Sequence, residues 1–341
     1  MEGIKNTLYE LCSEMTVSGF EYRAESKIRE LCGGIFNKVE RDALGSYVMV
    51  KKSTLPNAPR LLIDAHFDTV GMMVTDIYEN GFLGVVGIGG LDTRVLPAGE
   101  VTVYGKRDIY GIVTSTPPHL RKAGKNSAPK LSELYIDTGY TKEELEEIVS
   151  IGDPVGYRFM FTEMENGYVT TSGLDDKACV CAIIEAMRGI TVEELKYDVY
   201  VTISAQEETG KNGSARLSYD IDPDIVLTTD VNFAYGDGTP LYECIKCGDG
   251  AGVDISSLTD KKLTRGIIKL LKEKGIKHQL ICEPGRTYTN NDGLLIGGKG
   301  ARTAVFSIPL RNMHTPCETV KLDDIKNLAE ILKAVICKEG L

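Results

Sequence analysis

Short apolar segments that alternate with amphipathic helical segments constrain the fold of this chain most strongly. Residues 60–66 (RLLIDAH) form a short apolar run bounded by turn residues, which is typical of a buried strand. Four further runs are predicted to be strands: residues 197–205 (YDVYVTISA), 224–229 (DIVLTT), 277–282 and 303–308. Helical periodicity marks residues of about 176–189, 261–274 and 322–338 between or after them. Strands separated by helices predict an α/β fold with a mostly parallel sheet and helices on both faces.

Residues 71 to about 157 differ in composition and in hydrophobic pattern from the rest of the chain. Gly and Val become frequent, as in GFLGVVGIGG and VTVYGKRDIYGIVTS, and the first helical pattern in this region comes at residues 142–148. A segment of this length and composition predicts an inserted β-rich domain, a small barrel or sandwich. We therefore predict a catalytic domain in two parts, residues 1–70 and 161–341, interrupted by an inserted domain at residues 71–160.

Unusual polar residues lie at the ends of the predicted strands or at the start of the following helix. Open α/β sheets place their functional sites at the carboxyl ends of strands. The fold therefore predicts that one crevice collects His66, Asp68, Asp175, Asp176, Glu207, Glu208, Asp230 and His314.

This set of two imidazoles and several carboxylates predicts a metal site. Zinc and cobalt accept such a mixture of ligands, whereas magnesium and calcium favour oxygen alone. Five candidate ligands are too many for one open catalytic site, so we predict two metals. Each would have one His and one terminal carboxylate, and a bridging carboxylate would join them. Such a pair, about 3.5 to 4 Å apart, would hold a bridging hydroxide and polarise a carbonyl.

Spacing suggests roles for the remaining acidic residues. His66 and Asp68 are two residues apart and would share one face of a strand, so the Asp68 carboxylate could accept the spare ring proton of His66 and orient the ring. Glu207 and Glu208 are adjacent and point apart, so one can bind a metal while the other acts as general base.

Each element has a simpler interpretation when taken alone. Asp175 and Asp176 could be an N-cap pair, Asp230 could cap the next segment, and His314 could be a core histidine. We assign structural roles to His119 and His278. Nine cysteines without a secretion signal predict reduced thiols, and a single C-x-x-C at Cys244 and Cys247 is weak evidence for zinc.

Composition excludes several classes of partner. With a formal net charge of -10 the chain has no electrostatic support for binding nucleic acid or an anionic membrane. The first 15 residues have no uninterrupted apolar region, and no apolar run approaches membrane-spanning length. We therefore predict a cytoplasmic protein.

In its motifs and in their order along the sequence, the chain resembles the M42 family of metallo-aminopeptidases. This family includes glutamyl aminopeptidases, deblocking aminopeptidases and the tetrahedral TET peptidases. These motifs are SGFE at residues 18–21, DAHFDTVGMMV, IGDPV, GLDDKA, AQEETG, TTD and IPLRNMHTP. The resemblance implies a phosphorylase/hydrolase-like catalytic domain with an inserted β-barrel-like dimerisation domain. It also implies that two divalent metal ions bind His66, Asp175 as the bridge, Glu208, Asp230 and His314, with Glu207 as the base.

The same resemblance implies several further properties. Peptides with a free N-terminus would be the substrates, and the peptide bond between Asp175 and Asp176 would be cis. The chain would form a homo-oligomer built from dimers, with a tetrahedral dodecamer as the form common among relatives. Two departures from the family pattern, at residues 176–179 and at Asn312, leave the ligands and the base in place but put substrate preference in doubt.

Three other functions remain open from the sequence. Some family members carry the label endoglucanase, and a pair such as Glu207 and Asp175 could serve a glycosidase, although that chemistry gives no reason for two strand-end histidines. An M20-type amidohydrolase or deacetylase would share the metal set, but the β-rich insert argues against it. A catalytically dead scaffold normally lacks a ligand or the base, and none is missing here.

Overall fold

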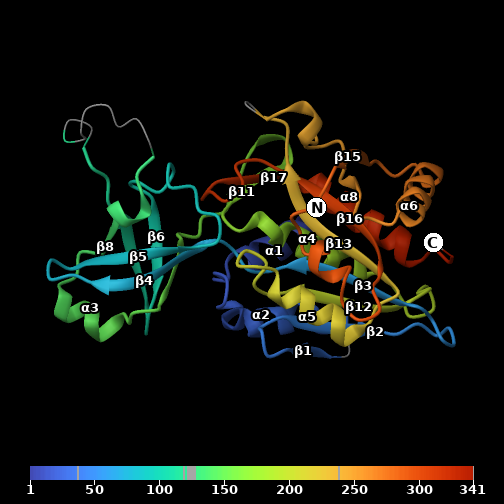
Figure 1. The fold of residues 1–341 in the computed structure, drawn as a ribbon, viewed down its shortest axis with the longest axis horizontal. Coiled ribbons are helices and arrows are strands. Elements are labelled where there is room, and N and C mark those ends of the chain that lie inside the picture. Colours follow the sequence, from blue (N-terminus) through green and yellow to red (C-terminus); the bar gives the residue numbers. More distant parts are fainter. Residues whose placement is uncertain (37, 118–119, 121–127, 237–238, 341) are drawn as a thin grey trace.

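Two bodies lie side by side along the long axis of the molecule, a larger α/β body and a smaller β-barrel (Figure 1). The structure, a computed structural model, describes residues 1–36, 38–117, 120, 128–236 and 239–340. No helix among these residues is both long and apolar enough to cross a bilayer.

Within the described residues, the larger body is built on an eight-stranded sheet with the order β1-β2-β12-β3-β13-β16-β14-β15. Its central strands β12, β3, β13 and β16 run parallel, as do β14 and β15, whereas the β1–β2, β2–β12 and β14–β16 pairs are antiparallel. The predicted mostly parallel sheet is thus confirmed. The strands span Val39–Arg41 (β1), Tyr47–Lys51 (β2), Arg60–His66 (β3), Asp198–Ser204 (β12), Ile225–Phe233 (β13), Gly252–Ser256 (β14), Gln279–Glu283 (β15) and Arg302–Leu310 (β16).

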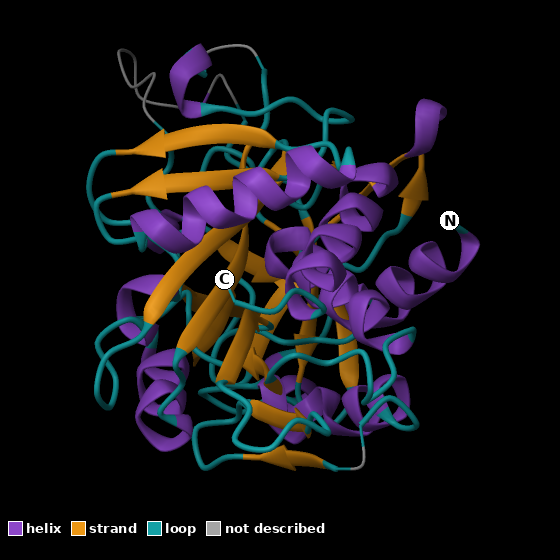
Figure 2. Ribbon diagram, turned by 90° about the vertical axis from the view of Figure 1, so that its right-hand side faces the viewer, coloured by secondary structure: helices purple, strands orange, loops and turns teal. Residues whose placement is uncertain are grey.

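Helices cover both faces of this sheet, as Figure 2 shows. Side chains alternate across β3, so Ile63 joins the core beneath α4 and α8 while Leu62 joins a smaller cluster with Leu217 of α5. This double burial explains why residues 60–66 form an almost continuous apolar run. The helices span Glu2–Cys12 (α1), Glu25–Cys32 (α2), Leu174–Arg188 (α4), Asn212–Ile221 (α5), Lys261–Lys274 (α6), Asn291–Leu294 (α7) and Leu322–Ile336 (α8).

The boundaries of α6 follow from its capping residues. The Asp260 side chain accepts a hydrogen bond from the backbone N–H of Leu263 at 2.6 Å, which satisfies one of the free donors of the first turn. Gly275 ends the helix with φ at 65°, a conformation that costs glycine little. Because both signals can be recognised in the sequence, the predicted bounds of this helix agree with those of α6 in the structure.

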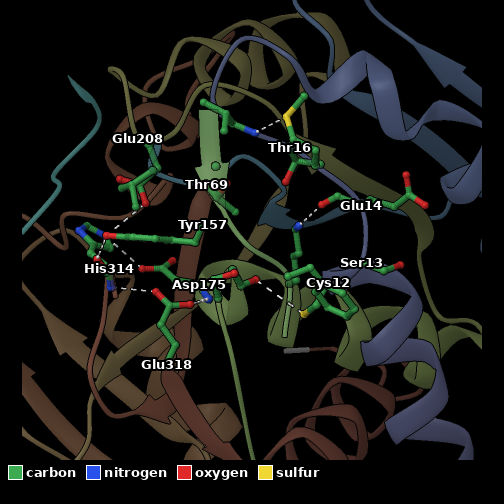
Figure 3. Close-up of a pocket in the computed structure, with 18 of the residues that line it drawn as sticks. Cys12, Ser13, Glu14, Thr16, Thr69, Tyr157, Asp175, Glu208, His314 and Glu318 are labelled. Atoms are coloured by element: carbon green, nitrogen blue, oxygen red, sulfur yellow. Dashed lines mark hydrogen bonds and ion pairs between the residues drawn. The ribbon is translucent and has the colours of Figure 1, made fainter. Parts of the chain in front are cut away.

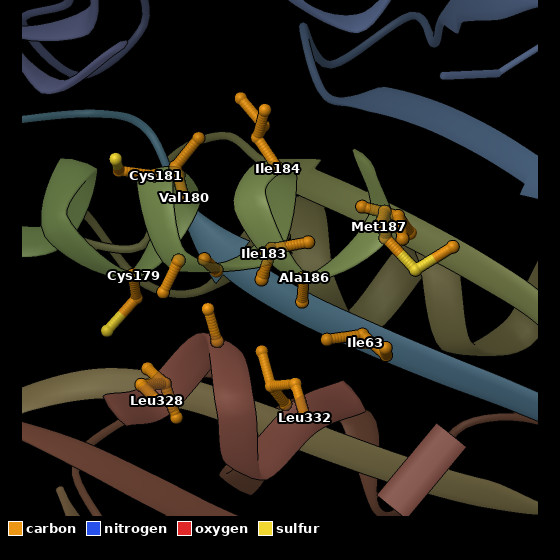
Figure 4. Packing of buried hydrophobic residues seen from close by; sticks show 14 of the residues in the cluster. Ile63, Cys179, Val180, Cys181, Ile183, Ile184, Ala186, Met187, Leu328 and Leu332 are labelled. Atoms are coloured by element: carbon orange, nitrogen blue, oxygen red, sulfur yellow. The ribbon is translucent and has the colours of Figure 1, made fainter. Parts of the chain in front are cut away.

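The core of the α/β body lies where α4 packs on α8 and on the sheet. Figure 4 shows Ile183 of α4, Leu328 and Leu332 of α8, and Ile63 of β3 converging. All four side chains are buried. Because α4 carries Asp175 near its N-terminus, this packing fixes the position of that carboxylate in the molecule.

We expect Leu332→Ala to lower the free energy of unfolding by about 2–5 kcal/mol, because it removes a fully buried side chain and leaves a cavity. Denaturant unfolding followed by circular dichroism measures this loss. Glu330→Ala, on the exposed side of the same helix, is the control and should change the stability by less than about 0.5 kcal/mol. Equal effects of the two substitutions would contradict this description of the core.

The smaller body is a closed barrel with the strand order β4-β5-β8-β7-β6-β9, which confirms the predicted fold class with a β-barrel-like insertion. Its interior is filled by buried Val101, Val103, Ile136 and Val155 among others. The division of the chain at residues 70 and 160 stays a prediction, as does a role of the barrel in dimerisation. The elements span Gly71–Ile77 (β4), Phe82–Ile88 (β5), Glu100–Tyr104 (β6), Asp108–Val113 (β7), Tyr135–Asp137 (β8), Lys142–Ile148 (α3) and Pro154–Tyr157 (β9).

A three-stranded sheet follows the barrel and leads the chain back to α4. In it β10 (Thr162–Glu163) pairs with β11 (Tyr168–Thr171), and β11 pairs with β17 (Glu318–Lys321). The pairing sets Thr171 opposite Glu318. It therefore brings the start of α4 next to the segment that carries His314.

One predicted strand end is wrong. The sequence places Asp230 just past a strand of residues 224–229, whereas β13 continues to Phe233 and Asp230 lies inside it. Pairing with β3 stops at Thr228, but β16 continues to pair with β13 up to Leu310. Asp230 therefore sits where β13 has lost one neighbour and kept the other, which leaves its side chain accessible from the strand-end crevice.

Candidate metal centre

The structure brings all five predicted metal ligands together. His66 is the last residue of β3, Asp175 lies in the first turn of α4, and Asp230 lies in β13. Glu208 follows β12, and His314 follows β16. Ligand atoms of His66, Asp175 and Asp230 lie within 4.8 Å of one another, and so do those of Asp175, Glu208 and His314.

The two oxygens of Asp175 face different histidines. Its Oδ1 lies 3.0 Å from His66 Nε2, and its Oδ2 lies 3.3 Å from His314 Nε2. Asp230 Oδ1 is 3.8 Å from His66 Nε2. Glu208 Oε1 is 3.2 Å from His314 Nε2, and Figure 3 shows these two side chains facing each other. A carboxylate shared in this way has the arrangement expected of a bridging ligand.

The backbone at the start of α4 departs from a helix. Asp175 and Asp176 have non-helical dihedral angles although they lie within the bounds of α4, and the peptide bond between them is cis, as the resemblance predicts. The adjacent aspartates therefore do not form the simple N-cap pair of an ordinary helix.

Electrostatics links these histidines to the carboxylates. Burial lowers the pKa of His66, but the hydrogen bond to Asp175 and the charge of Asp230 outweigh it and raise this pKa well above its usual value. Burial also opposes the charge of His314, yet Asp175 and Glu208 raise its pKa to about 11. For Asp175, burial disfavours ionisation, but hydrogen bonds from both rings hold its pKa below the usual range.

The carboxylates of Asp230 and Glu208 need nearby positive charge to stay ionised. Burial raises the pKa of Asp230 well above its usual value, and burial together with the charge of Asp175 raises that of Glu208. Carboxylates crowded in this way are ionised at little cost only when cations balance them. Here the histidines, whose pKa values are raised, favour that charge, and divalent cations would supply more while binding the neutral rings. The mixture of ring nitrogen and carboxylate oxygen fits zinc or cobalt.

The predicted contact of Asp68 with His66 is wrong in its atoms. His66 Nδ1 lies 2.9 Å from the backbone oxygen of Asp68, whereas the nearer carboxylate oxygen is 3.7 Å away. Because β3 ends at His66, the two residues do not share a strand face. The Asp68 carboxylate instead accepts hydrogen bonds from the backbone N–H groups of Glu207 and Glu208, at 2.9 and 3.1 Å. Asp68 thus holds the turn that carries both glutamates.

The two glutamates diverge as predicted. Glu208 faces His314, while the buried Glu207 carboxylate pairs with Lys211 and lines a cavity beside the cluster. Glu207 is in neither of the two candidate ligand groups.

Glu318 is a site residue that the sequence reasoning missed. Its buried carboxylate accepts hydrogen bonds from the backbone N–H of His314 at 2.8 Å and from that of Asp175 at 3.3 Å. Burial and the charge of Asp175 raise its pKa to about 8. Glu318 therefore ties two candidate ligands together through their backbones. A glutamate four residues after a histidine carries no sequence signal that separates this role from an exposed one.

Glu21 and Ser46 also hold the segment that leads into the Glu207 turn. Glu21 accepts a hydrogen bond from the backbone N–H of Gln206 at 3.0 Å, and Ser46 Oγ accepts one from that of Ala205 at 3.1 Å. Burial and the charge of Asp68 raise the pKa of Glu21 to about 7. Through Glu21, the SGFE motif of the N-terminal segment thus helps to position the turn that carries Glu207.

Of the two remaining histidines, only His278 is among the described residues, and it belongs to neither candidate ligand group. His278 Nδ1 contacts the backbone oxygen of Ile276 at 3.0 Å, in keeping with a structural role. His119 lies outside the described residues. Cys244 and Cys247 are free thiols, neither of which is a member of the two candidate ligand groups.

Two cavities meet at the cluster. One lies between the N-terminal segment, the barrel and β17, and Figure 3 shows Cys12 and Glu14 on one side of it and Tyr157 and His314 on the other. The second lies beside Glu207 and Asp230. An open α/β sheet with paired histidine and carboxylate groups at its strand ends, next to cavities, is the arrangement expected of a metal-dependent hydrolase.

Comparisons with known proteins narrow this class. Residues 45–331 match the family model of M42 glutamyl aminopeptidase. The chain is 31% identical to a lysyl aminopeptidase of Pyrococcus furiosus over 326 residues, which cover 94% of this chain and 93% of the relative. The chain therefore belongs to the M42 family and is a peptide-hydrolysing aminopeptidase.

Solved structures agree with this assignment. An aminopeptidase of Desulfurococcus kamchatkensis superposes with a TM-score of 0.92 at 28% identity, covering 99% of this chain and 95% of that one. The TET1 peptidase of Pyrococcus horikoshii, described as assembling into a tetrahedron or a large octahedral shell, gives 0.85 at 27% identity, covering 98% and 99%. The chain is therefore assigned to the M42 family and not to the M20-type amidohydrolases or deacetylases.

Proposed function

We propose that this chain is a dinuclear metal-dependent aminopeptidase that removes N-terminal residues from peptides. The observation that supports this most directly is the position of Asp175, whose two oxygens face the two histidines of two separate ligand groups. One metal would be held by His66, Asp175 and Asp230, and the other by Asp175, Glu208 and His314. When bound, such metals polarise the scissile carbonyl and lower the pKa of water.

Protein side chains would then move the protons. Glu207 would take a proton from the attacking water and return it to the leaving amine, because its carboxylate lines the cavity without belonging to either ligand group. Asp68 would position this base, since it fixes the backbone of Glu207 and Glu208. Glu318 would keep Asp175 and His314 in register by binding both backbones.

The relatives leave the preferred N-terminal residue open. The family model is described as a glutamyl aminopeptidase, whereas the relative from Pyrococcus furiosus is a lysyl aminopeptidase. Peptides with a free N-terminus are the proposed substrates. Preference among them would depend on the side chains that line the cavity beside the metals.

We also propose that the chain forms a homo-oligomer in which the barrel contributes to the dimer contact. Tyr110 and Ile112 share a face of β7 and are both exposed. The assembly of the TET1 peptidase supports this proposal, because that chain matches over nearly its whole length.

Removal of divalent metals should lower the rate of hydrolysis of aminoacyl p-nitroanilides by at least about 100-fold, because carbonyl polarisation and water activation would both be lost. Dialysis against EDTA followed by kinetic assays tests this, and added zinc or cobalt should restore activity. Circular dichroism before and after dialysis controls for unfolding. Cellulose hydrolysis that survives chelation would instead favour the glycosidase alternative.

A further inference from the structure

A cavity of about 280 Å³ lies beside the candidate metal centre. It contains Asp230 and Glu207, so a substrate whose scissile bond lies at the metals would extend a group into it. Its walls include apolar atoms of Val231, Phe233 and Met313. The cavity therefore has the shape of a pocket for one side chain, with the reacting atoms at one end.

Five carboxylates line this cavity, and four of them have a proposed role. Asp175, Glu208 and Asp230 are candidate ligands, and Glu207 is the candidate base. Glu283, at the end of β15, has none. Among the described residues no lysine or arginine lines the cavity or forms an ion pair with Glu283, although Lys211 pairs with the lining residue Glu207.

The position of Glu283 is fixed by a hydrogen bond from the metal side. Asn232 lies two residues after Asp230 on β13 and so shares its face of the sheet. Its Nδ2 donates to Glu283 Oε1 at 3.0 Å. The second oxygen, Oε2, is buried and has no hydrogen-bond partner among the described residues. Because Oε2 has almost no accessible surface, Glu283 lines the pocket through the rest of its half-buried side chain, and its carboxylate has one hydrogen-bond donor among the described residues.

An unsatisfied carboxylate oxygen in a partly buried site is costly unless a ligand completes it. Burial and the charge of Asp292 raise the pKa of Glu283 to about 6, against the opposing hydrogen bond from Asn232. The side chain therefore still carries negative charge at neutral pH. Apolar walls with one anionic acceptor fit an aliphatic stem that ends in a cation.

We propose that Glu283 selects substrates with lysine or arginine at the N-terminus. This inference rests on the proposed aminopeptidase function and adds the substrate class. The aliphatic part of the substrate side chain would lie along Val231 and Met313, and its cationic end would pair with the negative charge of the Glu283 carboxylate. A glutamyl side chain would meet a like charge in the same pocket and would be rejected.

Kinetic assays with lysyl, arginyl, leucyl and glutamyl p-nitroanilides test the proposal on the metal-loaded protein. We expect the wild-type kcat/KM to be highest for the lysyl and arginyl substrates and lowest for the glutamyl one. Glu283→Gln keeps the size of the side chain but removes its charge, and should lower the lysyl-to-leucyl ratio of kcat/KM on the order of 30-fold. The ratio cancels any loss of folded or metal-loaded protein. Glu243→Gln, an exposed change in η5 (Leu241–Glu243), which packs against β15, is the matched control and should leave the ratio unchanged.

Binding provides a second readout that does not depend on turnover. In the metal-loaded Glu207→Gln background, calorimetry should show tighter binding of L-lysinamide than of L-leucinamide, and Glu283→Gln should remove this difference. Metal-dependent cleavage of leucyl substrate with no lysyl preference, or with a ratio unchanged by Glu283→Gln, would overturn the inference and leave the aminopeptidase proposal intact. Absence of cleavage of every aminoacyl substrate by the metal-loaded protein would overturn both.

Discussion

Glu207→Gln is expected to lower kcat for aminoacyl p-nitroanilides by about 10²- to 10⁴-fold, the range for loss of a general base. The amide keeps the volume and part of the hydrogen bonding of the side chain but cannot accept the proton of the attacking water. Metal content should stay at the wild-type value, because Glu207 belongs to neither ligand group. Steady-state kinetics and elemental analysis of the same sample measure the two quantities together.

The adjacent Glu208→Gln is the matched comparison for this prediction. The two glutamates share the same turn, which Asp68 holds through both backbone N–H groups. Because Glu208 faces His314, its substitution should weaken metal binding, whereas Glu207→Gln should not. Near-wild-type turnover of Glu207→Gln, or equal loss of metal in both variants, would refute the proposed division of roles.

Asp175→Asn is expected to cause loss of at least one metal ion per chain and to reduce activity below that of Glu207→Gln. A neutral amide lacks the charge that two cations would share, and its nitrogen cannot act as a ligand toward one of them. A charge buried between two partners is also the kind of group whose removal has large effects, because the partners are left unpaired. Elemental analysis after gel filtration measures the remaining metal.

The neighbouring Asp176→Asn separates a ligand effect from a local folding effect. Asp176 is fully buried, belongs to neither ligand group, and has a pKa that burial raises well above its usual value. The amide keeps the size of the side chain and removes only its capacity to carry charge. If Asp176→Asn lost as much metal as Asp175→Asn, the bridging role of Asp175 would be rejected in favour of a disturbed start of α4.

The fold was predictable where local signals and tertiary demands agree. The helix of residues 261–274 has its own cap and stop signals, and the strand of residues 60–66 is apolar on both faces because both faces are covered. The strand predicted at residues 224–229 is too short because strand length depends on the neighbouring strands, and β16 continues pairing with β13 after β3 has stopped. No local residue pattern records which neighbour continues.

The sequence by itself determined the α/β class, the presence of a β-rich insertion, the M42 resemblance and the candidate ligands, because residue type and order carry those signals. Tertiary structure decided which atoms meet. It showed that the Asp68 carboxylate binds the glutamate turn instead of the His66 ring, that Glu318 joins the backbones of two candidate ligands, and that Glu283 shares a cavity with Glu207. These contacts join residues that lie far apart in the chain, and their distances are set by strand register and helix packing, which periodicity and composition do not encode.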